Sequence, residues 1–89
     1  MSDQSAPIVK VYSTKWCTDC MLAKQFLREH SVPYEDISLE MNVEAREYVI
    51  GKMGRTAKAP ILEINGKLLC GNPFDREALA RELGMDARP

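Results

Sequence analysis

The sequence lacks the features that mark a membrane, secreted or nucleic-acid-binding protein. No apolar run approaches the length that spans a bilayer, and residues 1–7 are polar, without the apolar core of a secretory signal. Neither sign of charge dominates, because 12 Lys and Arg residues stand against 13 Asp and Glu residues, for a net charge of -1. This balance gives no reason to expect nucleic acid or a membrane as a partner. We therefore expect a cytoplasmic protein.

The chain is also short and contains few cysteines. A chain of 89 residues can bury one core but has no room for a second lobe. We expect residues 1–7 to be a disordered lead-in, residues 8–84 to form the domain and residues 85–89 to be a tail. Three cysteines cannot all pair within one chain, and a reducing compartment keeps structural disulfides rare. A Cys-x-x-Cys pair here is therefore expected to be reactive or metal-binding rather than a structural crosslink.

Apolar periodicity predicts seven elements in the order β-α-β-α-β-β-α. Short β-branched or apolar runs predict strands at residues 8–12, 34–38, 61–64 and 67–70. Helical spacing predicts helices at residues 21–29, 43–53 and 73–83, the last with Asn72 as its cap and Pro73 at its first position. Asn65-Gly66 suits the type I′ turn of a hairpin. The order predicts an α/β fold with a four-stranded mixed sheet and helices on both faces.

The stretch Trp16-Cys17-Thr18-Asp19-Cys20 carries the reactive chemistry. Cys17 lies where the first strand gives way to a helix, and the partial positive charge of a helix N-terminus stabilises a thiolate relative to the thiol. Cys17 is therefore the expected nucleophile, which attacks a disulfide and forms a mixed disulfide with the substrate. Cys20 lies one helical turn further in, and we expect it to attack that mixed disulfide and release the substrate.

The residues beside the two cysteines are expected to tune them. The carboxylate of Asp19 opposes thiolate formation at Cys17, and Lys15 offsets part of this effect. Trp16 is expected to pack in the core or at the rim of the site and shield the Cys pair, with a direct substrate contact as the alternative.

The cysteines and the nearby charges are also compatible with other roles. The pair could form half of a zinc site completed by Cys70 and His30, but a helix at about 1.5 Å per residue places His30 roughly 20 Å from Cys17. Two merely structural thiols are disfavoured by their place at a helix N-terminus. Cys70 is expected to be a semi-buried thiol without a role, or else a partner in regulatory disulfides near the site. Arg55 and Lys58 are solvated charges or attract the carboxylates of a small thiol.

Residues 11–20, the Ala59-Pro60 pair and Gly71-Asn72-Pro73 together carry a family resemblance. In order and spacing the chain resembles the thioredoxin fold, and specifically its glutaredoxin-like branch. The resemblance implies that Pro60 is a cis-proline facing the Cys pair, and that the backbone of Ala59 hydrogen-bonds a bound substrate as an added strand would. We expect no metal and no tightly bound cofactor. The resemblance places these residues around the substrate: Trp16, Thr18, Asp19, Ala59, Pro60 and Gly71.

The resemblance leaves the electron source open. Glutathione-using glutaredoxins typically carry a lysine three residues before the first Cys and a Gly-Gly-x-Asp-Asp-like stretch, where this chain has Thr14 and residues 70–74. The pattern is instead similar to mycoredoxin-like proteins and to redoxins that serve ribonucleotide reductase. We expect a monomeric dithiol reductase of protein disulfides or mixed disulfides, supplied by a low-molecular-weight thiol or by thioredoxin reductase. The alternatives are an iron-sulfur cluster carrier and a redox-inactive binding module.

Overall fold

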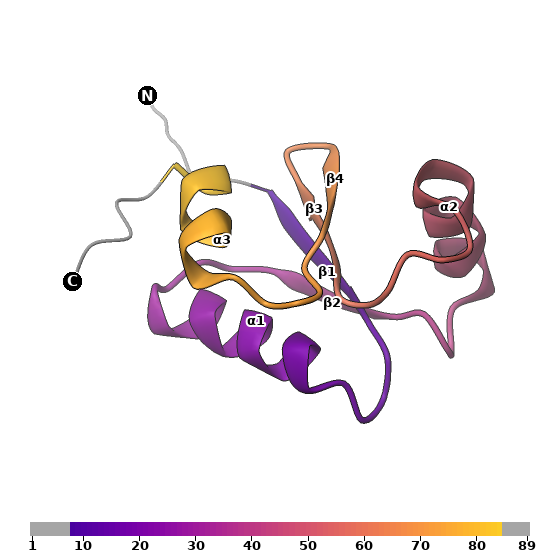
Figure 1. The fold of residues 1–89 in the computed structure, drawn as a ribbon, viewed down its shortest axis with the longest axis horizontal. Coiled ribbons are helices and arrows are strands. Elements are labelled where there is room, and N and C mark those ends of the chain that lie inside the picture. The colour runs from indigo at the N-terminus through magenta and orange to yellow at the C-terminus, as the bar shows by residue number, and fades with distance from the viewer. Residues whose placement is uncertain (1–7, 85–89) are drawn as a thin grey trace.

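A computed structural model describes residues 8–84 and contains the seven predicted elements in the predicted order (Figure 1). The expectations for residues 1–7 and 85–89 lie outside the described residues. The four strands are β1 (Val9–Ser13), β2 (Glu35–Ser38), β3 (Ile61–Ile64) and β4 (Lys67–Cys70). The three helices are α1 (Thr18–Glu29), α2 (Val43–Met53) and α3 (Arg76–Glu82). Within the described residues, no helix combines the length and apolar character needed to cross a membrane.

The four strands form one mixed sheet in the order β2-β1-β3-β4. Strand β2 is parallel to β1, whereas β3 is antiparallel to both β1 and β4. Positive φ angles at Asn65 (52°) and Gly66 (88°) confirm the tight hairpin turn. Because Tyr12 pairs with Ile61 in antiparallel strands, the C-terminal end of β1 and the N-terminal end of β3 lie side by side. This pairing brings the loop after β1 close to the segment before β3.

Helices cover both faces of the sheet, as predicted. Helices α1 and α3 lie on one side and α2 on the other (Figure 1). The alternation of side chains along β1 fits this arrangement, because Val9 and Val11 face α1 and α3 whereas Tyr12 faces α2. The larger core joins the sheet to α1 and α3 through these buried residues: Val9, Val11, Ala23, Phe26, Leu27, Val32, Leu62, Ile64, Leu79 and Ala80.

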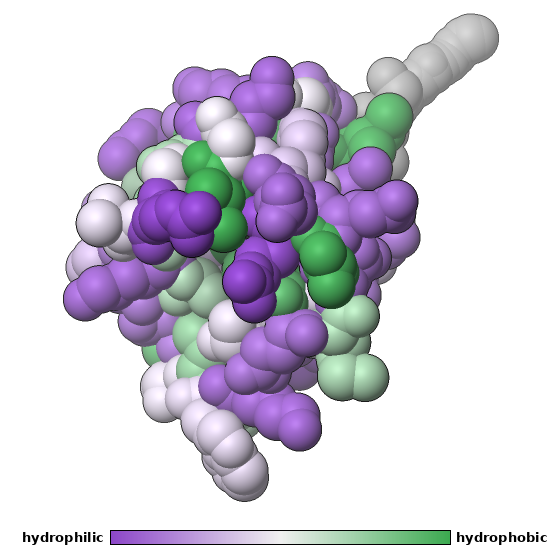
Figure 2. Space-filling model, turned by 90° about the vertical axis from the view of Figure 1, so that its right-hand side faces the viewer, coloured by the Kyte–Doolittle hydropathy of each residue, from purple (hydrophilic) through white to green (hydrophobic). Residues whose placement is uncertain are grey.

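The α2 side of the molecule has a small core and a mostly polar exterior. Its buried cluster consists of Tyr12, Val49 and Ile61. The outer surface is largely hydrophilic, with separate apolar patches (Figure 2). The Glu63 carboxylate accepts hydrogen bonds from the Tyr12 hydroxyl (2.8 Å) and the Tyr48 hydroxyl (3.2 Å), which tie α2 to the sheet. Burial, reinforced by the bond to Glu63, raises the pKa of Tyr12.

The predicted start of the last helix is wrong. Asp75, not Asn72, caps α3, because its side chain accepts hydrogen bonds from the backbone N–H groups of Glu77 and Ala78 (both 3.1 Å). The Asn72 side chain points elsewhere and donates to the Ala59 carbonyl at 2.9 Å. Pro73 follows a cis peptide bond and precedes the helix. The loop between β4 and α3 is therefore part of the region around Ala59 rather than the first turn of a helix.

Candidate active site

Cys17 is the N-cap residue of α1, a helix that begins at Thr18, three residues earlier than predicted. Its Sγ accepts a hydrogen bond from the Cys20 backbone N–H at 3.1 Å. The sulfur thus takes the place that a Ser or Asp oxygen occupies in a common helix cap. The Cys20 N–H group and the N-terminal end of the α1 dipole both face the Cys17 sulfur.

Cys20 has the opposite environment, because it lies in the first turn of α1 with only 1% of its surface exposed. Burial raises the pKa of its thiol well above the ordinary value of 9.0, and the hydrogen bond with Cys17 adds to this effect. The nearby Lys24 ammonium opposes the increase only in part. The two cysteines, one turn apart, are therefore a half-exposed sulfur at a helix end and a protected thiol beneath it.

The segment before β3 forms the facing wall of the site. The Cys17 thiol donates to the Ala59 carbonyl across a 3.6 Å contact. Ala59-Pro60 is a cis peptide, as the resemblance implies, and Pro60 is fully buried. A Cβ atom added at Gly71 would lie 3.0 Å from Pro60 Cγ, so Gly71 allows the end of β4 to lie against the proline. Of the predicted substrate-binding residues, Ala59 contacts Cys17 directly, Pro60 follows Ala59 in the chain, and Gly71 lies against Pro60.

The other predicted site residues differ from expectation or lie apart. The expected packing of Trp16 is wrong, because its side chain is 97% exposed and its φ is +57°, a left-handed conformation that is unusual for a bulky residue. Thr18 is exposed at the first position of α1. Asp19 accepts a hydrogen bond from the Phe74 backbone N–H at 3.3 Å, a contact that sequence reasoning did not foresee. Its carboxylate therefore also joins α1 to the loop before α3.

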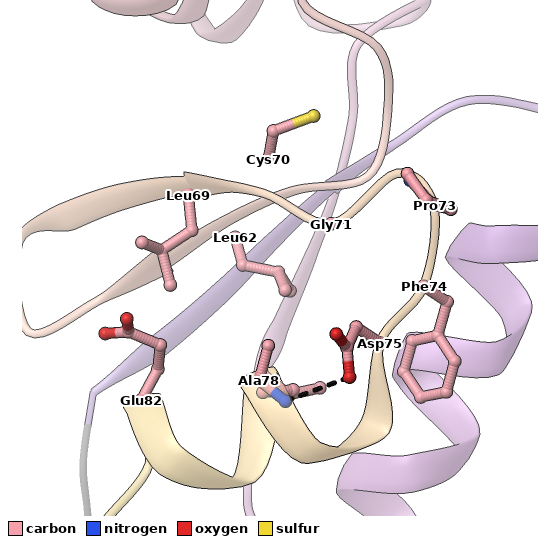
Figure 3. Close-up of a pocket in the computed structure, with 10 residues that line it drawn as sticks. Leu62, Leu69, Cys70, Gly71, Pro73, Phe74, Asp75, Ala78 and Glu82 are labelled. Carbon is pink, nitrogen blue, oxygen red and sulfur yellow. Dashed lines mark hydrogen bonds between the residues drawn. The ribbon is translucent and has the colours of Figure 1, made fainter.

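The third cysteine lies close to the site but faces away from the pocket beside it. Cys70 is exposed rather than semi-buried, and its thiol contacts the Lys58 carbonyl at 3.4 Å. Figure 3 shows its sulfur turned away from the pocket between β4 and α3 that Leu69, Phe74 and neighbouring residues line. Within residues 8–84, no group of three or more His, Cys, Asp and Glu side chains lies close enough together to hold a metal ion.

A second pocket, of about 370 Å³, lies between the site and α2. Thr14 and Ala59 form its wall nearest to Cys17, and Glu40, Arg46 and Arg55 contribute its charged groups. Arg55 was singled out from the sequence, whereas Arg46 was not. Two guanidinium groups in one pocket are suited to a ligand that carries carboxylates.

Comparison with known proteins shows the family to which this chain belongs. The sequence model of the family described as Glutaredoxin matches residues 9–69, which include both cysteines and Pro60. The chain belongs to the glutaredoxin family. It is 35% identical to a glutaredoxin of Pseudomonas aeruginosa over 81 residues, which cover 91% of this chain and 94% of that protein.

Solved structures agree with this glutaredoxin fold. The thioredoxin-like protein BC3987 superposes with a TM-score of 0.73 at 27% identity, over 84% of this chain and 99% of that one. The holo form of glutaredoxin C1 from Populus tremula x tremuloides gives 0.66 at 25% identity, over 93% and 87% of the two chains. The family and fold support thiol-disulfide exchange as the general chemistry of this glutaredoxin-like chain.

Native alkylation is expected to distinguish the three thiols. Near neutral pH a small alkylating reagent should modify Cys17 and Cys70 and spare Cys20, because burial limits access and the raised pKa keeps the Cys20 thiol protonated. As the pH rises toward 9.0, the protection of Cys20 should persist, since its pKa lies above that value. Mass spectrometry should count two adducts on the folded chain and three on the unfolded chain. A third adduct at the same rate in the folded protein would contradict this description.

Proposed function

We propose that this protein is a dithiol thiol-disulfide oxidoreductase in which Cys17 is the nucleophile and Cys20 the resolving thiol. The observation that supports this proposal is the difference between the environments of Cys17 and Cys20. Cys17 Sγ receives the Cys20 N–H at the start of α1, whereas the Cys20 thiol is buried with a raised pKa. Cys17 therefore attacks the substrate first. Cys20, which is protonated, reacts only after the mixed disulfide has formed.

The reaction divides into two exchanges. The Cys17 thiolate attacks one sulfur of the substrate disulfide, and the other sulfur leaves as a thiolate that takes a proton from solvent. Cys20 then loses its proton and attacks Cys17 Sγ, which forms the Cys17–Cys20 disulfide and releases the second substrate thiol. The substrate gains two electrons and the protein loses two. We expect the Ala59 backbone, whose carbonyl contacts the Cys17 thiol, to hydrogen-bond an extended substrate.

Restoring the dithiol requires a two-electron donor, for which we propose either a low-molecular-weight thiol or thioredoxin reductase. The pocket with Arg46 and Arg55 supports a small thiol, because it could hold the carboxylates of such a molecule beside Ala59. The partners would be proteins that carry disulfides or mixed disulfides with a small thiol. The chain would work as a monomer in the cytoplasm, where thiols are kept reduced.

An assay with two parallel electron supplies tests the proposal. One arm contains NADPH with thioredoxin reductase, and the other contains a low-molecular-weight thiol with its own reductase. We expect NADPH consumption that depends on this protein in at least one arm when insulin or a small disulfide is the substrate. Absence of turnover in both arms would overturn the proposed function.

A further inference from the structure

The Ala59 carbonyl oxygen is a shared acceptor at the centre of the site. It receives the Cys17 thiol at 3.6 Å and the side-chain amide of Asn72 at 2.9 Å. Two donors on one carbonyl oxygen draw on the same electron density, so each hydrogen bond is weaker than it would be alone and the two donors compete for the acceptor. Asn72 lies beyond residues 9–69, the part of the chain that the family model matches.

The loop that carries Asn72 is fixed at both ends. On one side the Gly71 N–H donates to the Pro60 carbonyl at 2.8 Å. On the other side the Phe74 N–H donates to Asp19 at 3.3 Å, and the Phe74 ring lies 6.3 Å from the ring of Phe26 in α1. Figure 3 shows Phe74 against α1 and Gly71 at the end of β4. These contacts hold the Asn72 amide on the Ala59 oxygen.

We infer that Asn72 is a positioning residue for Cys17, which favours the Cys17 thiolate by competing with the Cys17 thiol for the Ala59 carbonyl. The bond from sulfur to Ala59 exists only while Cys17 carries its proton, so it stabilises the neutral thiol. The shorter bond from Asn72 takes part of the same acceptor and weakens that stabilisation. The Cys20 N–H, which stabilises the charged sulfur, is unaffected.

Other charged and ionisable groups around Cys17 come from two segments. Lys15, Asp19 and Cys20 belong to its own segment. Lys58 precedes Ala59 in the facing segment, and the Cys70 thiol contacts the Lys58 carbonyl. None of these side chains donates a hydrogen bond to the Ala59 carbonyl, so none can replace Asn72 in this competition.

The direction in which the Cys17 titration moves when Asn72 is removed distinguishes this role from a merely structural one. If Asn72 only held the loop in place, its removal would loosen the site and admit water, and better solvation favours the charged thiolate. If Asn72 competes for the acceptor, its removal leaves the carbonyl to the Cys17 thiol and favours the neutral form. The two roles predict shifts of the Cys17 titration in opposite directions.

The test is an ultraviolet thiolate titration of the reduced full chain, carried out without substrate. A Cys70→Ser background removes the exposed thiol, and Cys20 stays protonated over the range because its pKa is raised. We expect Asn72→Ala to move the Cys17 midpoint upward by about half a pH unit, roughly threefold less thiolate below the midpoint. Asn72→Gln, which keeps an amide donor, should recover part of the shift.

Asp19→Asn provides a matched comparison, because its amide oxygen can still accept from Phe74 while the negative charge is lost. It should move the midpoint downward. An unchanged or lowered midpoint in Asn72→Ala, with circular dichroism showing a native fold, would overturn the inference. The catalytic consequence rests on the proposed function, but the titration does not. A protein that passes the titration and reduces no disulfide would refute only the proposed function.

Discussion

Replacement of Cys17 with serine is expected to abolish disulfide reduction, with a rate loss of about a thousandfold or more. A serine hydroxyl can occupy the N-cap and accept the Cys20 N–H, so the helix should be preserved. It cannot supply a sulfur nucleophile near neutral pH, and the buried Cys20 is a poor substitute. The measurement is the initial rate in the donor arm that supports the wild-type protein.

Cys20→Ser is the matched variant, because it removes the second sulfur and leaves the first. This variant should still attack a disulfide through Cys17 but should accumulate a mixed disulfide, visible as a mass increase that reductant reverses. The assignment of roles would be wrong if Cys20→Ser lost the first exchange while Cys17→Ser kept it. Circular dichroism of both variants should match the wild-type protein.

Gly71→Val should destabilise the fold by about 1–3 kcal/mol and slow disulfide reduction by about tenfold or more. A Cβ at this position meets Pro60 Cγ at 3.0 Å, Leu62 Cδ1 at 3.2 Å and the Pro60 carbonyl at 3.3 Å. Pro60 is fully buried and can yield only by moving Ala59, which faces Cys17. Denaturant unfolding measures the stability loss, and the donor assay measures the rate.

Gly51→Val is the control for adding the same side chain elsewhere. Gly51 lies in α2, and an added Cβ there has no neighbour within 4 Å. Its stability should change by only about a few tenths of a kcal/mol, because valine and glycine are both weak helix formers. Equal losses in the two variants would contradict the view that Gly71 is needed for the close approach to Pro60.

The parts of the fold that local signals specify could be predicted from the sequence. Asn65-Gly66 between two apolar runs predicted the hairpin, and Gly54 marked the end of α2. The Cys17–Cys20 spacing after a buried strand predicted a sulfur at a helix N-terminus. Each of these features depends on residues close together in the sequence.

Two of the mistakes concern contacts between distant residues, whereas the late predicted start of α1 and the exposure of Trp16 are local. Asn72-Pro73 matches the pattern of a helix start, but Asp75 caps the helix and Asn72 bonds Ala59, 13 positions earlier in the chain. The sequence indicates Asp19 as a charge beside Cys17 and as a substrate-binding residue, but not its hydrogen bond to Phe74, which lies 55 residues away. Trp16 is exposed rather than packed over the Cys pair, and no local pattern indicates this exposure. Such contacts depend on the assembled sheet, which the sequence pattern does not display.

The exposure of Trp16 has a consequence for how this protein could evolve. Its side chain is 97% exposed and belongs to neither core cluster, so a replacement removes no packing from the interior. A residue such as glycine or asparagine would adopt its left-handed backbone more readily. Substitutions at this position, adjacent to Cys17, can therefore be selected for their effect on substrate contacts. They need no second mutation to restore the packing of the core. A substitution of Trp16 can change which partner the protein prefers while the stability of the fold stays the same.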